Sequence, residues 1–162
     1  MSTLAPIAFV QHDHRACRKA AMATARKICE RRQVRLTPVR ERVLELLCRA
    51  HQPMRAYDIL DQLGAEGYGS QPPVVYRALE FLLEHGLVHR IERLNAFLAC
   101  HCPEADHRAK FLICTRCRRV AEFDDRAVAK ALRNVAKNTG FEIGEATLEV
   151  EGVCSDCSEP VA

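Results

Sequence analysis

The sequence has no apolar run long enough to cross a membrane. Its N-terminal apolar stretch LAPIAFV is short, lacks a basic leader and is followed by the polar segment QHDHRACRK. We therefore expect no secretory signal peptide. These absences argue against a membrane protein and predict a cytoplasmic location.

A large excess of one charge sign is also missing, because the net charge of the whole chain is only +3. The charge is nevertheless unevenly distributed. Residues 15–49 contain eleven Lys or Arg and three Glu, whereas residues 50–162 contain thirteen Lys or Arg and seventeen acidic residues. A basic N-terminal part favours a polyanion as partner, and the alternative is a helix face that is simply soluble.

Cysteine, in contrast, is abundant, with nine in 162 residues. In a reducing compartment such cysteines indicate metal or redox chemistry before disulfides. Four of them form two C-x-x-C pairs, each able to present two thiolates to one ion, and four thiolates make the closed tetrahedral site that zinc favours. A redox pair would begin a helix, whereas these pairs follow expected strands. We predict a structural zinc site at Cys114, Cys117, Cys154 and Cys157.

Four short helices precede the first expected strand. Thr37 is the expected N-cap of the second helix, with Pro38 in its first turn, and Gly86 ends the fourth. In the first helix, Ala20, Ala23 and Ile28 with Met22 and Cys29 form a weak apolar stripe. We expect these helices over residues 15–32, 36–50, 55–67 and 72–86, and interpret Cys17, Cys29 and Cys48 as small buried apolar residues.

The segments LVHRIE and AFLAC, on either side of RLN, predict a β-hairpin. Short helices closed by a hairpin are typical of a winged helix-turn-helix, in which the helix before the hairpin enters the major groove of DNA. Val74–His85 is then the recognition helix. Tyr76 and Arg77 lie in its first turns, where they can reach bases and phosphates; the alternative is that they pack or are solvated.

A second, smaller unit follows a loose segment. We expect strands at 110–114 and 119–123, a helix over 126–138 capped by Asp125 and ended by Gly140, and a strand at 146–152. So small an α/β module needs a metal or self-association for stability. The predicted fold class is α+β, with a loose N-terminus at 1–14, a winged-helix domain at 15–99, a hinge at 100–108 and an α/β domain at 109–162.

A second group of possible metal ligands lies around the hairpin. If the hairpin turns on Leu94 and Asn95, His89 and Cys100 face each other at a distance that suits one ion. A slip of the register by one residue would separate them. Further candidates nearby are His101, Cys102, Asp106, His107 and Glu122.

Several segments together resemble the ferric uptake regulator (Fur) superfamily, and within it the zinc uptake regulator (Zur) branch. The resemblance extends over about residues 20–157 and rests on RLTPVRERVLELL, AYDILDQL, PPVVYRALEFLLEHGLVHRIE, FLICTRC and the second C-x-x-C pair.

This resemblance implies a homodimeric repressor that binds double-stranded operator DNA in response to zinc. It implies a winged-helix domain, an α/β dimerisation domain and two zinc ions per chain, one structural and one regulatory. The regulatory ligands would be His89, Cys100, His107 and Glu122. DNA contacts would fall to Tyr57, Tyr76, Arg77 and Arg35.

Two positions depart from the family pattern. Val74 stands where a threonine is usual, and the histidine cluster that commonly precedes the first cysteine pair is reduced to ADHRAK, which makes a third metal site doubtful. Our hypothesis is that the regulatory zinc joins the wing to the dimerisation domain and thereby sets the spacing of two recognition helices. A cysteine among its ligands favours zinc over iron.

An iron- or peroxide-responsive repressor of the same superfamily is the alternative within that resemblance. From a different class, a zinc-dependent hydrolase could use Glu122 as general base. The sequence lacks H-E-x-x-H and H-x-E…P-C-x-x-C, since HCPEAD has the wrong spacing. A thiol oxidoreductase would need exposed cysteines of low pKa. We therefore expect no enzyme and no small organic substrate.

Overall fold

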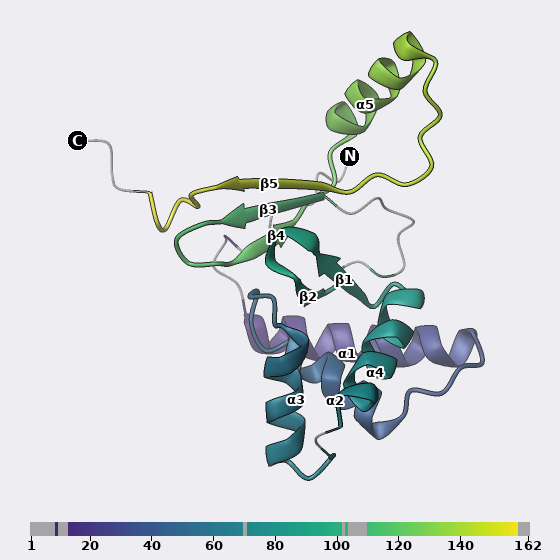
Figure 1. Cartoon of the computed structure of the whole chain (residues 1–162), viewed down its shortest axis with the longest axis vertical. Helices are drawn as coiled ribbons and strands as arrows, with labels where there is room; N and C mark the ends of the chain where they lie inside the picture. Colours follow the sequence, from purple (N-terminus) through teal and green to yellow (C-terminus); the bar gives the residue numbers. More distant parts are fainter. Residues whose placement is uncertain (1–8, 10–12, 70, 102, 104–109, 159–162) are drawn as a thin grey trace. The chain divides into compact units, whose positions relative to one another are not determined.

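The structure, a computed structural model, describes residues 9, 13–69, 71–101, 103 and 110–158 (Figure 1). The chain divides into two compact units. One comprises residues 12–105, and the other comprises residues 106–162 together with residues 1–11. Among the described residues, no helix has the length and apolar character needed to span a membrane.

The first unit contains four helices and a hairpin. Asp13 caps the first helix by accepting hydrogen bonds from the backbone N–H groups of Arg15 and Ala16, and Thr37 caps the second as expected. Gly86, at φ 67°, follows the end of the fourth helix, in the left-handed region that glycine adopts most easily. The elements are α1 (His14–Arg31), α2 (Pro38–Leu47), α3 (Ala56–Ala65), α4 (Pro72–Glu84), β1 (Val88–Ile91), the 3-10 helix η2 (Glu92–Leu94) and β2 (Ala96–Ala99).

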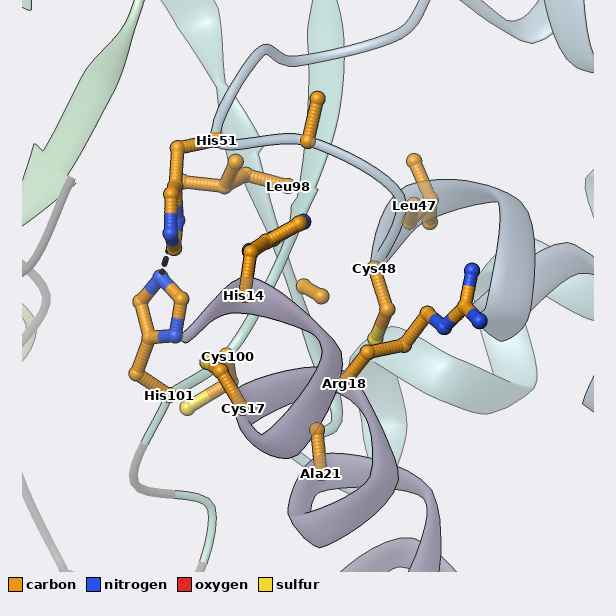
Figure 2. Close-up of a pocket in the computed structure, with 12 residues that line it drawn as sticks. His14, Cys17, Arg18, Ala21, Leu47, Cys48, His51, Leu98, Cys100 and His101 are labelled. Carbon is orange, nitrogen blue, oxygen red and sulfur yellow. Dashed lines mark hydrogen bonds between the residues drawn. The ribbon is translucent and has the colours of Figure 1, made fainter. Parts of the chain in front are cut away.

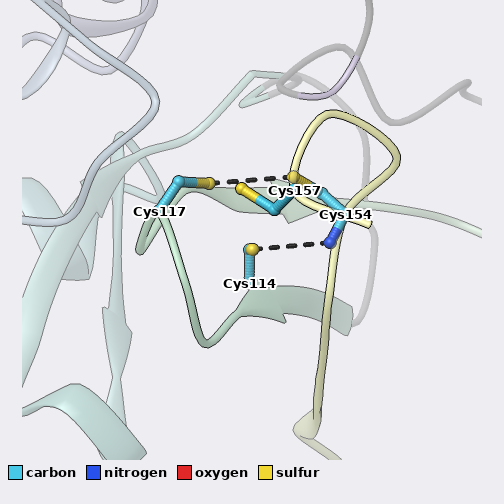
Figure 3. A group of neighbouring side chains, drawn as sticks. All are labelled: Cys114, Cys117, Cys154 and Cys157. Carbon is cyan, nitrogen blue, oxygen red and sulfur yellow. Dashed lines mark hydrogen bonds between the residues drawn. The ribbon is translucent and has the colours of Figure 1, made fainter. Parts of the chain in front are cut away.

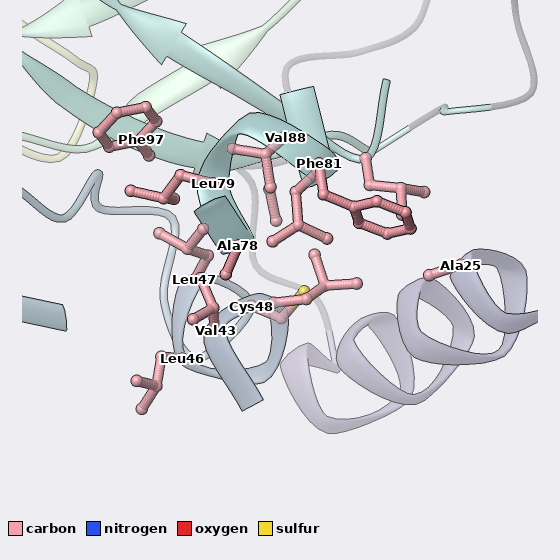
Figure 4. Packing of buried hydrophobic residues seen from close by; sticks show 14 of the residues in the cluster. Ala25, Val43, Leu46, Leu47, Cys48, Ala78, Leu79, Phe81, Val88 and Phe97 are labelled. Atoms are coloured by element: carbon pink, nitrogen blue, oxygen red, sulfur yellow. The ribbon is translucent and has the colours of Figure 1, made fainter. Parts of the chain in front are cut away.

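One apolar core joins these elements (Figure 4). Side chains of α2 and α4 such as Val43, Leu47 and Leu79 are at most 1% exposed, and Phe97 of the hairpin closes the same core. The expected stripe of α1 is partly wrong. Met22, Ala25, Ile28 and Cys29 are buried, whereas Ala20 and Ala23 are exposed.

The hairpin register differs from the expected one. His89 pairs with Leu98, and the backbone N–H of Cys100 donates to the carbonyl of Leu87. The expected turn at Leu94–Asn95 is wrong because η2 and the left-handed Asn95 (φ 45°) together make a longer connection. The register therefore shifts by two residues rather than one, so His89 and Cys100 stay on one face of the hairpin as diagonal neighbours.

Over its described residues, the second unit has a three-stranded sheet and one α-helix. Its strands lie in the order β4-β3-β5, with β4 antiparallel and β5 parallel to β3. Asp125 caps the helix and Gly140 ends it, as the sequence predicts. The elements are β3 (Lys110–Cys114), β4 (Val120–Glu122), α5 (Arg126–Thr139) and β5 (Leu148–Gly152).

Candidate metal centre and nucleic-acid interface

Two cysteine pairs meet at one end of the sheet of the second unit (Figure 3). Cys114 is the last residue of β3 and pairs with Gly152, the last residue of the parallel strand β5. Cys154 follows two residues later. Because parallel neighbours end at the same edge of a sheet, the two pairs converge although thirty-six residues separate them.

The four sulfurs fit a tetrahedral ion. The Sγ atoms of Cys114, Cys117, Cys154 and Cys157 all lie within 4.8 Å of one another. Those of Cys117 and Cys154 are 3.7 Å apart, and sulfurs bound at about 2.3 Å to one tetrahedral zinc stand about 3.8 Å apart. None of these four is in a disulfide. The donor set and its spacing therefore suit structural zinc.

The surroundings of these thiols favour the charged form of two of them. Burial alone would raise the pKa of Cys114, but backbone N–H groups, including that of Cys154 at 3.4 Å, donate to its sulfur and lower the pKa to about 6. Burial likewise opposes ionisation of Cys117. Its pKa is nevertheless lowered, chiefly because Arg119 Nε donates to its sulfur over 3.3 Å. Thiolates are the form that binds metal.

Arg119 also links the two cysteine pairs to each other. Its Nη2 lies 3.7 Å from Cys154 Sγ and 2.5 Å from the carboxylate of Asp156. Arg116, between Cys114 and Cys117, reaches the second pair as well, because its Nη1 donates to the carbonyl of Cys157 over 2.6 Å. These contacts orient the cysteine-bearing turns around the sulfurs.

A second pair of potential ligands lies on the hairpin of the first unit. A ring nitrogen of His89, on β1, and Sγ of Cys100, just after β2, lie within 4.8 Å of each other. Cys100 is only 3% exposed, and His89 is half-buried. The corrected register thus still brings these two side chains together.

Of the other two predicted regulatory ligands, the structure describes Glu122 but not His107. Glu122 ends β4 in the second unit, where it pairs with Phe111 and is half-buried. His107 and Cys102 lie outside the described residues. His101 is described, and its ring lies against His51.

The residues predicted to contact DNA lie at the surface of the first unit. Tyr57, near the start of α3, and Tyr76, in the first half of α4, are 68% and 45% exposed. Arg77 and Arg35 are exposed as well. These side chains are therefore accessible to a partner of the first unit.

A basic cleft of about 370 Å³ lies between α1 and α2. Arg42 is fixed there by Glu45 at 2.7 Å and by Glu66 at 2.5 Å. The sequence predicted only a basic N-terminal part and did not predict this cleft. Its lining is mostly cationic and consists of Arg15, Arg18, Lys19, Arg26, Arg42 and Arg49, with Met22 and Glu45.

The model of the ferric uptake regulator family matches residues 31–151. The zinc uptake regulation protein of Escherichia coli K12 is 40% identical over 139 residues, which are 85% of this chain and 81% of that protein. The chain belongs to the ferric uptake regulator family.

Solved structures agree with this membership. A zinc uptake regulator in complex with zinc and DNA is similar with a TM-score of 0.79 and 38% identity, over 86% of this chain and 94% of the other. Holo XcZur is similar with a TM-score of 0.76 and 43% identity, over 85% and 96% of the two chains. The expected α+β fold with an N-terminal winged helix is confirmed.

Membership of the ferric uptake regulator family confirms the resemblance noted from the sequence, and it makes this chain a transcription regulator rather than an enzyme.

One group of potential metal ligands was not predicted from the sequence. His14, Cys17 and His51 lie together in the first unit, although we had interpreted Cys17 as a packing residue. The i, i+3 spacing of His14 and Cys17 at the start of a helix was the available signal.

Proposed function

We propose that the chain is a zinc-responsive transcriptional repressor that binds operator DNA as a homodimer when zinc is replete, and so controls zinc uptake genes. The observation that carries the proposal is the similarity to a regulator solved with zinc and DNA, supported by the proximity of two potential zinc ligands, His89 and Cys100, on the hairpin. The proposed site of action is the cytoplasm.

The structural zinc is assigned to Cys114, Cys117, Cys154 and Cys157. With four protein ligands the site has no open position, so it stabilises the unit without responding to small changes in zinc. When bound, this ion holds the turn after β3 to the turn after β5.

The regulatory zinc is assigned to His89, Cys100, His107 and Glu122, which gives two zinc ions per chain for the proposed function. His89 and Cys100 support this assignment by their proximity on the hairpin. His107 and Glu122 rest on the sequence argument. A thiolate in the set favours zinc over iron, because thiolate is a softer ligand than carboxylate.

DNA recognition is assigned to the first unit. We assign contacts with bases and phosphates in the major groove to Arg77 and Tyr76, which are exposed on α4. Tyr57 and Arg35 are assigned to further DNA contacts. Arginines of the cleft between α1 and α2 add positive charge to the same unit.

The surface of α5 and β5 supports self-association. Of the described residues of α5, Ala136 alone is buried, while Leu132 and Val135 are 38% and 62% exposed. Val150 of β5 and Phe141 are exposed by 43% and 67%. Apolar surface of this kind is typical of a protein interface. A dimer also supplies the two recognition helices that a two-fold operator requires.

The proposal is tested with Cys100→Ser, followed by operator binding across buffered free zinc. We expect the variant to remain a folded dimer and to lose zinc-dependent DNA affinity, because one regulatory ligand is removed. Cys29→Ser is the matched control, since Cys29 is also buried, at 2% exposure, but lies in α1 away from the proposed ligands. Unchanged zinc-dependent affinity in Cys100→Ser would refute the assignment. Stronger activation by iron or manganese than by zinc would favour the related iron or peroxide response.

A further inference from the structure

A small cavity in the first unit is lined by an unusual number of metal-binding side chains (Figure 2). The ligand atoms of His14, Cys17 and His51 all lie within 4.8 Å of one another. His101 extends the group, because His51 Nδ1 and His101 Nε2 are 3.2 Å apart. Of the five histidines that the structure describes, two therefore belong to this group and a third contacts one of them.

The fold brings this group together from three distant segments. Asp13 fixes the start of α1, so His14 and Cys17 lie one turn apart on the same face of that helix. His51 lies on the connection between α2 and α3, and His101 follows β2. All four residues belong to the same compact unit.

The size of the cavity restricts what it can hold. Its volume is about 10 Å³, which is room for about one water-sized sphere. An organic ligand does not fit in this space. A single ion fits, because its ligands supply the atoms around it.

Hydrogen bonding orients His14 as a ligand. The Nε2 atom of His14 lies 2.6 Å from the carbonyl oxygen of Arg49. A carbonyl only accepts, so Nε2 carries the proton and the buried Nδ1 carries the lone pair. Metal-bound histidines commonly donate their other N–H to a backbone carbonyl in this way.

The spacing of His51 and His101 also fits one ion. Two nitrogens bound at about 2.0 Å to a tetrahedral zinc stand about 3.3 Å apart, close to the observed 3.2 Å. Imidazoles with a thiolate are a ligand set that zinc accepts readily. Three cysteines line the cavity, namely Cys17, Cys48 and Cys100. Of these, Cys17 is the one whose sulfur lies within 4.8 Å of the ligand atoms of both His14 and His51, so we take it as the thiolate donor.

We propose that His14, Cys17 and His51, with His101 as fourth ligand, form an additional zinc site inside the winged-helix unit. The ion joins the first turn of α1 to the α2–α3 connection and to the end of β2. This site lies beyond the proposed function and uses none of the residues assigned to the structural or regulatory zinc. It brings the count to three zinc ions per chain.

The first test compares zinc content by mass spectrometry, on the full-length chain equilibrated with buffered zinc. Replacing His14 and His51 together, by His14→Gln and His51→Gln, should remove one zinc equivalent per chain. His85→Gln is the matched control, because His85 lies at the end of α4 against Phe81 and away from the cavity. Equal zinc content in the double variant and the unchanged chain would overturn the proposal.

A second test identifies the thiolate without relying on substituted histidines. In a background that carries both Cys100→Ser and Cys102→Ser, added Co²⁺ should give a thiolate-to-cobalt absorption band from Cys17 while zinc remains bound to the four-cysteine site. Adding Cys17→Ser should abolish that band, with unchanged circular dichroism showing that the fold is intact. A band that persists without Cys17 refutes the site. Because the background lacks both Cys100 and Cys102, this result is independent of the regulatory assignment.

Discussion

At the scale of single residues, Arg119 is the side chain that most directly prepares the four-cysteine site. It donates to Cys117 Sγ, approaches Cys154 Sγ and is itself held by Asp156. A guanidinium beside sulfur favours the thiolate, and zinc binds only the thiolate. Protons and zinc therefore compete for these sulfurs, and Arg119 lowers the affinity of the sulfurs for protons.

We predict that Arg119→Ala raises the pH at which half of the structural zinc is released. Without the arginine the pKa of Cys117 rises, so protonation displaces zinc at a higher pH than in the unchanged chain. The measurement is zinc release during an acid titration, followed with a chromogenic chelator. Arg118→Ala, in the same turn, is the control and should leave the release curve in place. Identical curves for Arg119→Ala and the unchanged chain would contradict the role assigned to Arg119.

At the scale of elements, the helices follow from the sequence and the hairpin register does not. Thr37 with Pro38, Asp125 and Gly140 mark helix ends through local hydrogen bonds and dihedral angles, which neighbouring residues determine. The register of β1 and β2 depends instead on the connection at 92–95. A short 3-10 helix and one left-handed residue there are not encoded by a recognisable turn motif.

Asn95 gives a direct test of that connection. At φ 45° it lies in the left-handed region, where a residue with Cβ other than Asn or Asp is disfavoured by about 1 kcal/mol. Asn95→Ala should lower the free energy of unfolding by about this amount, and Asn95→Gly should change it little. Arg90→Ala serves as control, because it removes the 3.2 Å hydrogen bond to Asn95 without changing the backbone. Chemical denaturation measures all three, and equal losses for Ala and Gly would exclude the backbone explanation.

One of the candidate metal sites could be predicted from local sequence spacing, and another could not. The sequence predicted the C-x-x-C pairs because each pair is local, and the parallel strands then bring the pairs together. The cluster of His14, Cys17 and His51 combines a helix start with a connection more than thirty residues later. No spacing rule for a single segment finds such a group, since it exists only after α1 packs against the core.

At the scale of the whole molecule, zinc is expected to contribute differently to the two units. The first unit has a continuous apolar core of its own, whereas the second buries little of α5. A small unit with so few buried side chains depends on other sources of stability. The zinc proposed at the four cysteines would supply such stability from within the chain.

We predict that Cys114→Ser lowers the unfolding temperature of the second unit and weakens dimerisation, because a structural zinc supplies folding free energy. The first unit should keep its helical signal. Calorimetry and sedimentation velocity measure the two effects, with Cys29→Ser as the control for loss of a buried thiol. A second unit that unfolds at the same temperature with and without Cys114 would contradict a structural role.

The parallel pairing of β3 and β5 has a consequence for how this unit can change during evolution. The four cysteines lie where the two strands end, so the connection that returns from α5 to β5, at residues 142–147, contributes no ligand to the metal site. The entropic cost of closing a loop grows only slowly with its length. Insertions and deletions within residues 142–147 should therefore be tolerated while the two cysteine pairs stay unchanged.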